Sequence, residues 1–165
     1  MKKIRIGIFG CGRGASYFNI IAQNDGEVVA VCDFNEKLML NSVKDLEKKP
    51  ACYTDFEDFF KHDMDAVFLA NYFHEHAPYA IRFLEKGVHV ISECTSNGTM
   101  AEGVELVRAA EKSNAIYMLA ENYPFMKCNQ EMRRVYRSGN LGKFLFGEGE
   151  YNHPMEEIRY FIQQH

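Results

Sequence analysis

The chain has 165 residues, of which 47% are hydrophobic and 25% are charged, and its net charge is −4 at pH 7. This composition is typical of a globular protein and excludes collagen-like, coiled-coil and disordered chains. Because there is no excess of Lys and Arg, we expect no nucleic-acid partner, and no apolar run approaches the roughly 20 residues that cross a bilayer.

The five cysteines are odd in number, widely spaced and without a Cys-x-x-Cys pair. This usage favours a reducing compartment and predicts neither a disulfide framework nor a zinc site. The apolar stretch after residues 1–5 is too short for the core of a signal peptide. We therefore expect a cytoplasmic protein with no membrane partner.

Short apolar runs alternate with longer segments of helical periodicity from the start of the chain. The runs predict strands at 4–9, 28–32, 66–70, 88–91 and 116–119. They are mostly apolar on both faces, as in parallel strands that are covered on both sides. Apolar residues three and four apart predict helices within 17–21, 38–46, 77–84 and 104–110. The repeating order predicts an α/β fold, a doubly wound parallel sheet of the NAD(P)-binding Rossmann type.

Local signals support these boundaries. Thr99 and Glu102 have the spacing of a capping box at a helix start, and Gly87 lies where a left-handed cap would end a helix. The segment 51–62 is ambiguous, with a short strand at 51–53 and one or two helical turns at 56–60.

The pattern changes after the strand at 116–119, and we place the domain boundary between 1–122 and 123–165. The second part predicts a helix at 127–137 with Met132, Val135 and Tyr136 facing inward. It then predicts a turn at 139–142, a strand at 144–152 and a helix at 155–164. One strand and one helix cannot form a sheet of their own. We therefore expect a shortened form of a longer protein with an α+β second domain, or pairing of this strand with another chain.

A G-x-G-x-x-A run, the glycine loop of residues 10–15, directly follows the first predicted strand and precedes a helix. Such a loop presents backbone N–H groups at a helix N-terminus, and its glycines allow a pyrophosphate to approach closely. A glycine-rich turn without a ligand is the alternative for this motif alone. The candidate cofactor-binding residues here are Gly10, Gly12, Arg13, Gly14 and Ala15.

Asp33 ends the second predicted strand about twenty residues after Gly12, where a carboxylate can accept hydrogen bonds from an adenosine ribose. The alternative is that Asp33 only caps the following helix. The two features together predict dinucleotide binding. A carboxylate at this position repels a 2′-phosphate and so favours NAD over NADP, although the guanidinium of Arg13 could still accommodate a phosphate.

Two further polar segments, 71–76 and 92–97, follow predicted strands at the carboxyl edge, where ligands of such sheets bind. His74 and His76 are two residues apart and share no helix face, so we predict no metal site. The alternative for them is a cap at the helix start with a solvated histidine. The segment 92–97 lies beside the nicotinamide half of any bound dinucleotide.

The layout resembles the glucose-fructose oxidoreductase, inositol dehydrogenase and rhizopine catabolism family (Gfo/Idh/MocA), and the resemblance runs through Asn152. Besides the glycine loop and Asp33, four family motifs recur. The motif A-T-P-x-x-x-H-x-x-x-A appears as Ala70, Asn71, Tyr72, His76 and Ala80, and G-K-H-V-x-x-E-K-P appears as residues 87–95. The motif T-x-x-E appears as Thr99 and Glu102, and G-x-L/I-G appears as residues 139–142.

The resemblance implies a Rossmann domain that binds NAD, with Asn71, His76 and Glu93 near the nicotinamide pocket. Two departures bear on the chemistry. The lysine of E-K-P, which in the family helps to move the proton of the substrate hydroxyl, is Cys94 here, and a thiol cannot replace an ammonium group. The T-P pair of the pocket is Asn71 and Tyr72.

The family includes NAD-dependent glycosidases, similar to α-N-acetylgalactosaminidase, which oxidise the sugar at C3, eliminate the aglycone, add water and reduce again. That branch does not keep the lysine, and residues 121–123 and 147–153 resemble segments of it. The resemblance implies Tyr151 and His153 as proton-transfer residues, and a histidine pKa near neutrality suits this role. A strand tyrosine and a solvated loop histidine are the alternatives.

Cys94 is also a candidate catalytic residue, as a nucleophile that a histidine would have to activate. The alternative is an inert small residue.

We therefore predict an NAD-dependent oxidoreductase that transfers hydride between nicotinamide and a sugar, polyol or related carbinol. The alternatives are a redox-neutral NAD-dependent glycosidase or lyase and, outside enzymes, a non-catalytic NAD-binding fragment. The resemblance also implies a homo-oligomer for the full-length form.

Overall fold

The structure is a computed structural model that describes residues 3–150 and residue 152. It divides into two units, Met1–Glu121 and Asn122–His165. The division falls one residue before the boundary that the sequence predicts.

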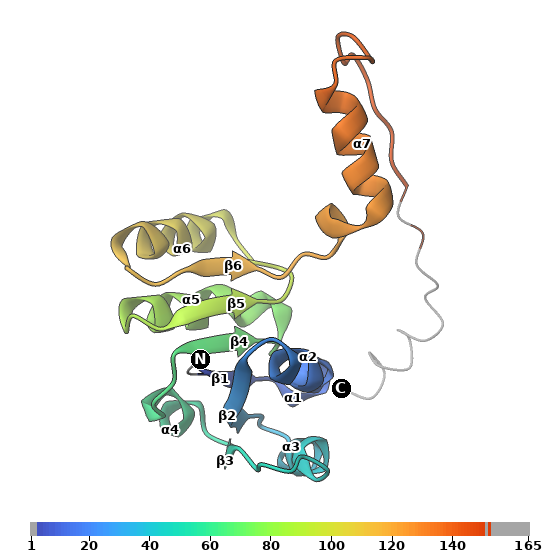
Figure 1. The fold of residues 1–165 in the computed structure, drawn as a ribbon. Helices are drawn as coiled ribbons and strands as arrows, with labels where there is room; N and C mark the ends of the chain where they lie inside the picture. Colours follow the sequence, from blue (N-terminus) through green and yellow to red (C-terminus); the bar gives the residue numbers. More distant parts are fainter. Residues whose placement is uncertain (1–2, 151, 153–165) are drawn as a thin grey trace. The chain divides into compact units, whose positions relative to one another are not determined.

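A six-stranded parallel sheet forms the centre of the first unit (Figure 1). Its strands are β1 (Ile4–Phe9), β2 (Gly26–Cys32), β3 (Ala51–Tyr53), β4 (Ala66–Leu69), β5 (His89–Ser92) and β6 (Tyr117–Leu119). The strand order is β3-β2-β1-β4-β5-β6, and every neighbouring pair is parallel. The chain therefore reverses its direction of travel across the sheet between β1 and β4, which confirms the predicted doubly wound fold.

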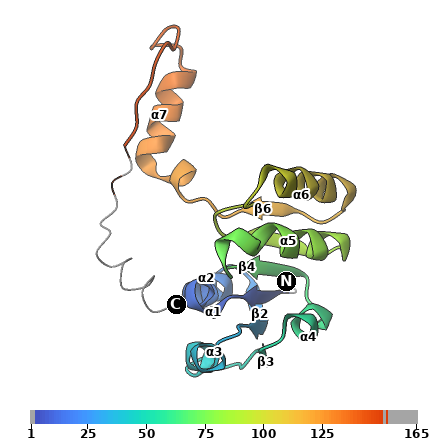
Figure 2. The same cartoon turned by 180° about the vertical axis from the view of Figure 1, so that it is seen from behind.

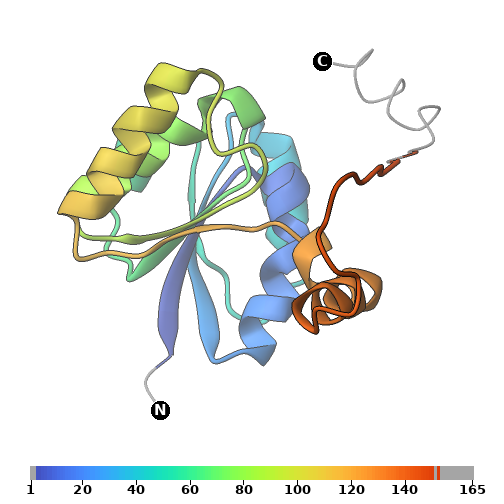
Figure 3. The same cartoon turned by 90° about the horizontal axis from the view of Figure 1, so that it is seen from above.

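Helices connect the strands and cover both faces of the sheet (Figures 2 and 3). They are α1 (Cys11–Gly14), α2 (Phe18–Gln23), α3 (Glu36–Val43), α4 (Phe56–Lys61), α5 (His76–Glu85) and α6 (Met100–Lys112), with 3-10 turns η1 (Ala15–Tyr17) and η2 (Phe73–Glu75). Thr99 caps α6 in a capping box with Glu102. Gly87 has a φ of +80° just after α5. Both predicted helix signals are thus confirmed.

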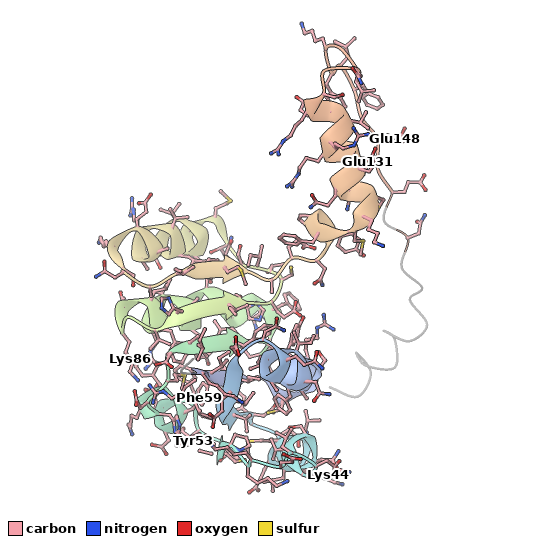
Figure 4. All side chains as sticks on the ribbon, in the orientation of Figure 1. Lys44, Tyr53, Phe59, Lys86, Glu131 and Glu148 are labelled. Carbon is pink, nitrogen blue, oxygen red and sulfur yellow. The ribbon has the colours of Figure 1, made fainter. Side chains whose placement is uncertain are left out.

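Alternation along the strands sends apolar side chains to two cores. Ile8 packs with the buried residues of α1, α2 and α3, whereas its neighbour Phe9 packs with those of α4, α5 and α6. Phe59 of α4 and Tyr53 of β3, both labelled in Figure 4, have ring centroids 6.1 Å apart. Burial on both faces explains why the strands are almost continuously apolar.

The second unit contains η3 (Tyr123–Phe125) and α7 (Lys127–Arg137), the latter with the predicted bounds. The prediction that Met132 and Tyr136 face inward is wrong, because both side chains are exposed. Among the described residues of this unit no sheet covers the apolar face of α7. Gly139 and Gly142 have positive φ and form the predicted turn.

The predicted strand at 144–152 does not form at residues 144–150 and 152. A strand needs the backbone groups of a neighbouring strand, and the described part of the second unit offers none. Tyr151 and the predicted helix at 155–164 lie outside the described residues. None of the described helices has the length and apolar content of a membrane span.

Candidate functional site

The glycine loop turns sharply from β1 into α1. It lies at the switch point of the sheet, the place between β1 and β4 where the chain reverses its direction across the sheet. Gly10 has a φ of +94°, and a Cβ built on it would overlap the carbonyl oxygen of Ala70 at the end of β4. A Cβ on Gly14 would lie 2.5 Å from Cγ2 of Ile8. On Gly12, by contrast, an added Cβ would approach no atom more closely than 3.8 Å. Gly10 and Gly14 are thus needed for packing, and Gly12 leaves the loop open to a ligand.

Asp33 holds the glycine loop to the end of β2. Its Oδ2 accepts a hydrogen bond from the Cys11 N–H at 2.7 Å, and its Oδ1 accepts one from the Asn35 N–H at 2.8 Å. The cap of α3 is Asn35, whose side chain accepts from the Leu38 N–H. The alternative that Asp33 caps this helix is therefore wrong.

His76, the first residue of α5, is buried, with 1% of its surface exposed. Its Nδ1 lies 2.8 Å from the carbonyl oxygen of Thr95, and its Nε2 lies 3.3 Å from that of Asn71. The ring therefore joins the loops that follow β4 and β5. The alternative of a solvated histidine is wrong for His76, whereas His74 is exposed.

Asn71 presents an unpaired amide at the end of β4. Its Nδ2 and Oδ1 are both buried, and neither has a hydrogen-bond partner among the described residues. A buried amide without partners is costly. A ligand with one acceptor and one donor, such as a carboxamide, would satisfy both atoms. This residue therefore fits the nicotinamide half of a dinucleotide.

Glu93, directly after β5, binds two side chains that come from the opposite side of the switch point. Its Oε1 accepts from Arg13 Nε at 2.7 Å and from the Tyr17 hydroxyl, and an Arg13 Nη donates to the same hydroxyl at 3.0 Å. Burial alone would raise the pKa of Glu93, but the hydrogen bonds from Tyr17 and Arg13 outweigh it and lower that pKa. Glu93 is therefore a carboxylate.

Tyr17 was not among the predicted site residues. Its spacing of four residues from Arg13 is a signal that the two side chains share a helical face.

Cys94 lies among acidic groups. Its thiol donates to Oε2 of Glu121 at 3.2 Å. Burial, this hydrogen bond and the charges of Glu121 and Glu93 raise the pKa of Cys94 to about 11. A nucleophilic cysteine needs a cation or a base that lowers its pKa. These surroundings favour an inert thiol.

The remaining predicted residues are not brought into this arrangement. Tyr151 and His153 lie outside the described residues. Within the part of the chain that the structure covers, no three His, Cys, Asp or Glu side chains are grouped as metal ligands. A groove of about 640 Å³ between α5 and α6 is lined by residues such as Lys86 and Asn114. These residues precede β5 and β6, so the groove is remote from the carboxyl edge.

Comparison with known proteins identifies the family. Residues 4–121 match the Gfo/Idh/MocA family model, described as an oxidoreductase family with an NAD-binding Rossmann fold. A glycosyl hydrolase family 109 protein from Saccharopolyspora erythraea is 30% identical over 95% of this chain and 37% of its own length. An α-N-acetylgalactosaminidase from Shewanella oneidensis is 28% identical over 94% of this chain and 36% of its own length. The chain thus spans little more than a third of these relatives.

Solved structures agree on the fold. A myo-inositol 2-dehydrogenase from Lactobacillus plantarum has a TM-score of 0.88 with 20% identity, over 99% of this chain and 49% of its own. A scyllo-inositol dehydrogenase from Lactobacillus casei, solved with NAD(H) and scyllo-inositol, has a TM-score of 0.79 with 24% identity, over 86% of this chain and 43% of its own. Because the family model matches most of the chain, the chain belongs to the Gfo/Idh/MocA family of oxidoreductases with an NAD-binding Rossmann fold.

Proposed function

We propose that this chain is the NAD-binding part of an enzyme that takes hydride from a carbinol carbon of a sugar or polyol. The observation that carries the proposal is the buried, unpaired amide of Asn71 at the switch point of the sheet. It lies on the β4 side, while the open loop surface at Gly12 and the carboxylate of Asp33 lie on the β1–β2 side. Together these residues provide partners for the carboxamide, pyrophosphate and adenosine ribose of one dinucleotide.

NAD⁺, when bound, supplies the hydride acceptor. The residues of this chain bind and orient. His76 fixes the two loops around Asn71, and Glu93 supplies a negative charge at the end of β5. With a pKa of about 11, the Cys94 thiol is a poor acceptor for the hydroxyl proton near neutral pH. For proton transfer we propose Tyr151 and His153, the residues that the family resemblance implies.

The site favours NAD over NADP. The carboxylate of Asp33 would repel a 2′-phosphate. This carboxylate is held in place by the two backbone N–H groups that its oxygens accept. Arg13, the cation that could compensate, forms an ion pair with Glu93 instead.

A second candidate is the redox-neutral glycosidase cycle, in which the hydride returns to the sugar within one turnover. Two observations support it. Cys94 replaces the family's lysine, and the relatives from Saccharopolyspora and Shewanella are named as glycosyl hydrolase family 109 and α-N-acetylgalactosaminidase.

One experiment separates these candidates. The chain is incubated with NAD⁺ and either a panel of polyols and free sugars or a panel of nitrophenyl glycosides, while NADH absorbance and nitrophenolate are followed. Accumulation of NADH with a polyol or free sugar supports the dehydrogenase. Nitrophenolate without net NADH supports the glycosidase. Bound NAD with neither product would contradict catalysis by this chain alone and support a non-catalytic NAD-binding chain.

We further propose a cytoplasmic homo-oligomer for the whole protein. The five cysteines, all free thiols in the structure, support a reducing compartment.

A further inference from the structure

Arg13, Tyr17 and Glu93 form a charged cluster, the Arg13 cluster, that bridges the two sides of the switch point. The guanidinium lies 5.3 Å from the centroid of the Tyr17 ring. That ring packs on Phe68 of β4 with centroids 4.3 Å apart. The cluster is therefore anchored to the sheet as well as paired in charge.

The two charges of the cluster differ in position and in exposure. Arg13 belongs to the glycine loop, whereas Glu93 follows β5, on the same side of the switch point as Asn71. The side chain of Glu93 is 14% exposed and that of Arg13 is 56% exposed. Since water screens an exposed charge more strongly, the carboxylate dominates the local field.

We propose that the Arg13 cluster sets the relative affinity of this chain for NAD⁺ and NADH, with Glu93 favouring the oxidised form and Arg13 opposing it. This inference rests on the proposed function. The nicotinamide ring is cationic in NAD⁺ and neutral in NADH. The carboxylate of Glu93, on the same side of the switch point as Asn71, therefore stabilises the ring only in NAD⁺. Contacts to the pyrophosphate and adenosine are common to both forms and cancel in the ratio of the two dissociation constants.

The test is a calorimetric titration of the chain with NAD⁺ and, separately, with NADH. We expect a wild-type ratio of Kd for NADH to Kd for NAD⁺ above one. Glu93→Gln should lower the ratio about fivefold and Arg13→Gln should raise it about twofold, because the two charges act with opposite sign. A tenfold change in this ratio corresponds to about 30 mV in the potential of the bound couple.

Two further variants make the test specific. Arg82→Gln breaks a comparable Arg–Glu pair, in which Arg82 of α5 contacts Glu57 of α4 at 2.7 Å, and neither helix contributes a residue to the cluster. It should leave the ratio unchanged. Tyr17→Phe keeps the ring on Phe68 but removes the hydroxyl that shields Glu93, so the ratio should rise slightly. This variant keeps the proposal testable if Glu93→Gln does not fold.

Unchanged ratios, or shifts of the same sign in Glu93→Gln and Arg13→Gln, would overturn this inference while leaving the proposed function intact. If neither nucleotide binds the wild-type chain, the proposed function fails and this inference fails with it.

Discussion

The two halves of the carboxyl edge are built in different ways. In the β1–β2 half, defined here as the glycine loop and Asp33, the geometry lies mainly in the backbone of the loop, which has a positive φ at Gly10 and is held by one side chain, Asp33, through the Cys11 N–H. In the β4–β5 half, defined as Asn71, His76, Glu93 and Cys94, side chains meet partners from other segments. The first half is a local motif, and the second is a product of the fold.

The largest effect should come from the backbone of the β1–β2 half. Gly10→Ala should lower the free energy of unfolding by about 4 kcal/mol, since it adds a left-handed backbone cost and an overlap with Ala70. Gly12→Ala is the matched control, because its Cβ would approach no atom more closely than 3.8 Å. It should leave stability within about 0.5 kcal/mol but weaken NAD binding. Urea unfolding measures the stability of both variants, and an equal loss of stability in Gly10→Ala and Gly12→Ala would contradict the assigned roles.

His76→Ala tests whether the β4–β5 half depends on one buried ring. Loss of the contacts to Thr95 and Asn71, together with a cavity, should lower the free energy of unfolding by about 2 to 3 kcal/mol. His74→Ala is the control, since that ring is exposed, and it should change stability by less than about 0.5 kcal/mol. A stable His76→Ala variant would show that the two loops are held by other contacts.

Asp33→Ala removes the one side chain on which the β1–β2 half depends. NAD affinity should fall by about 1 to 3 kcal/mol, the scale of a lost charged hydrogen-bond acceptor. Asp55→Ala provides the comparison, because Asp55 also accepts a backbone N–H, at the start of α4, but outside the site. Calorimetry on both variants is decisive: unchanged affinity in Asp33→Ala would remove this residue from the site.

The smallest effect concerns the acidic surroundings of Cys94. Its pKa is raised from 9.0 to about 11, so below pH 9 its thiolate fraction is about 100-fold lower than that of an unperturbed thiol. Alkylation by iodoacetamide, followed by mass spectrometry, should therefore be slow at pH 8 and accelerate up to about pH 11. Glu121→Gln should lower the pKa and speed alkylation about threefold at pH 8. Fast alkylation of the wild-type Cys94 at pH 7 would contradict the assigned environment.

The same contrast explains what the sequence could predict. The glycine spacing requires a tight turn, and strand periodicity places Asp33 beside it, so the β1–β2 half follows from local rules. The bond between Arg13 and Glu93 joins residues 80 positions apart. No local pattern encodes that partner, and the unpaired amide of Asn71 likewise depends on how neighbouring loops pack.

Residues 144–150 show the limit of periodicity. Their alternation is typical of a strand, but a strand also needs a neighbour with which to exchange hydrogen bonds. Met132 and Tyr136 are exposed for a related reason, since an apolar face is buried only where another element covers it.

The most direct test of the central claim is a calorimetric titration of this chain with NAD and, separately, with NADP. The account predicts micromolar binding of NAD and binding of NADP that is at least about tenfold weaker, because Asp33 repels the 2′-phosphate and Arg13 is engaged by Glu93. Absence of binding by either nucleotide, or equal affinity for both, would contradict it.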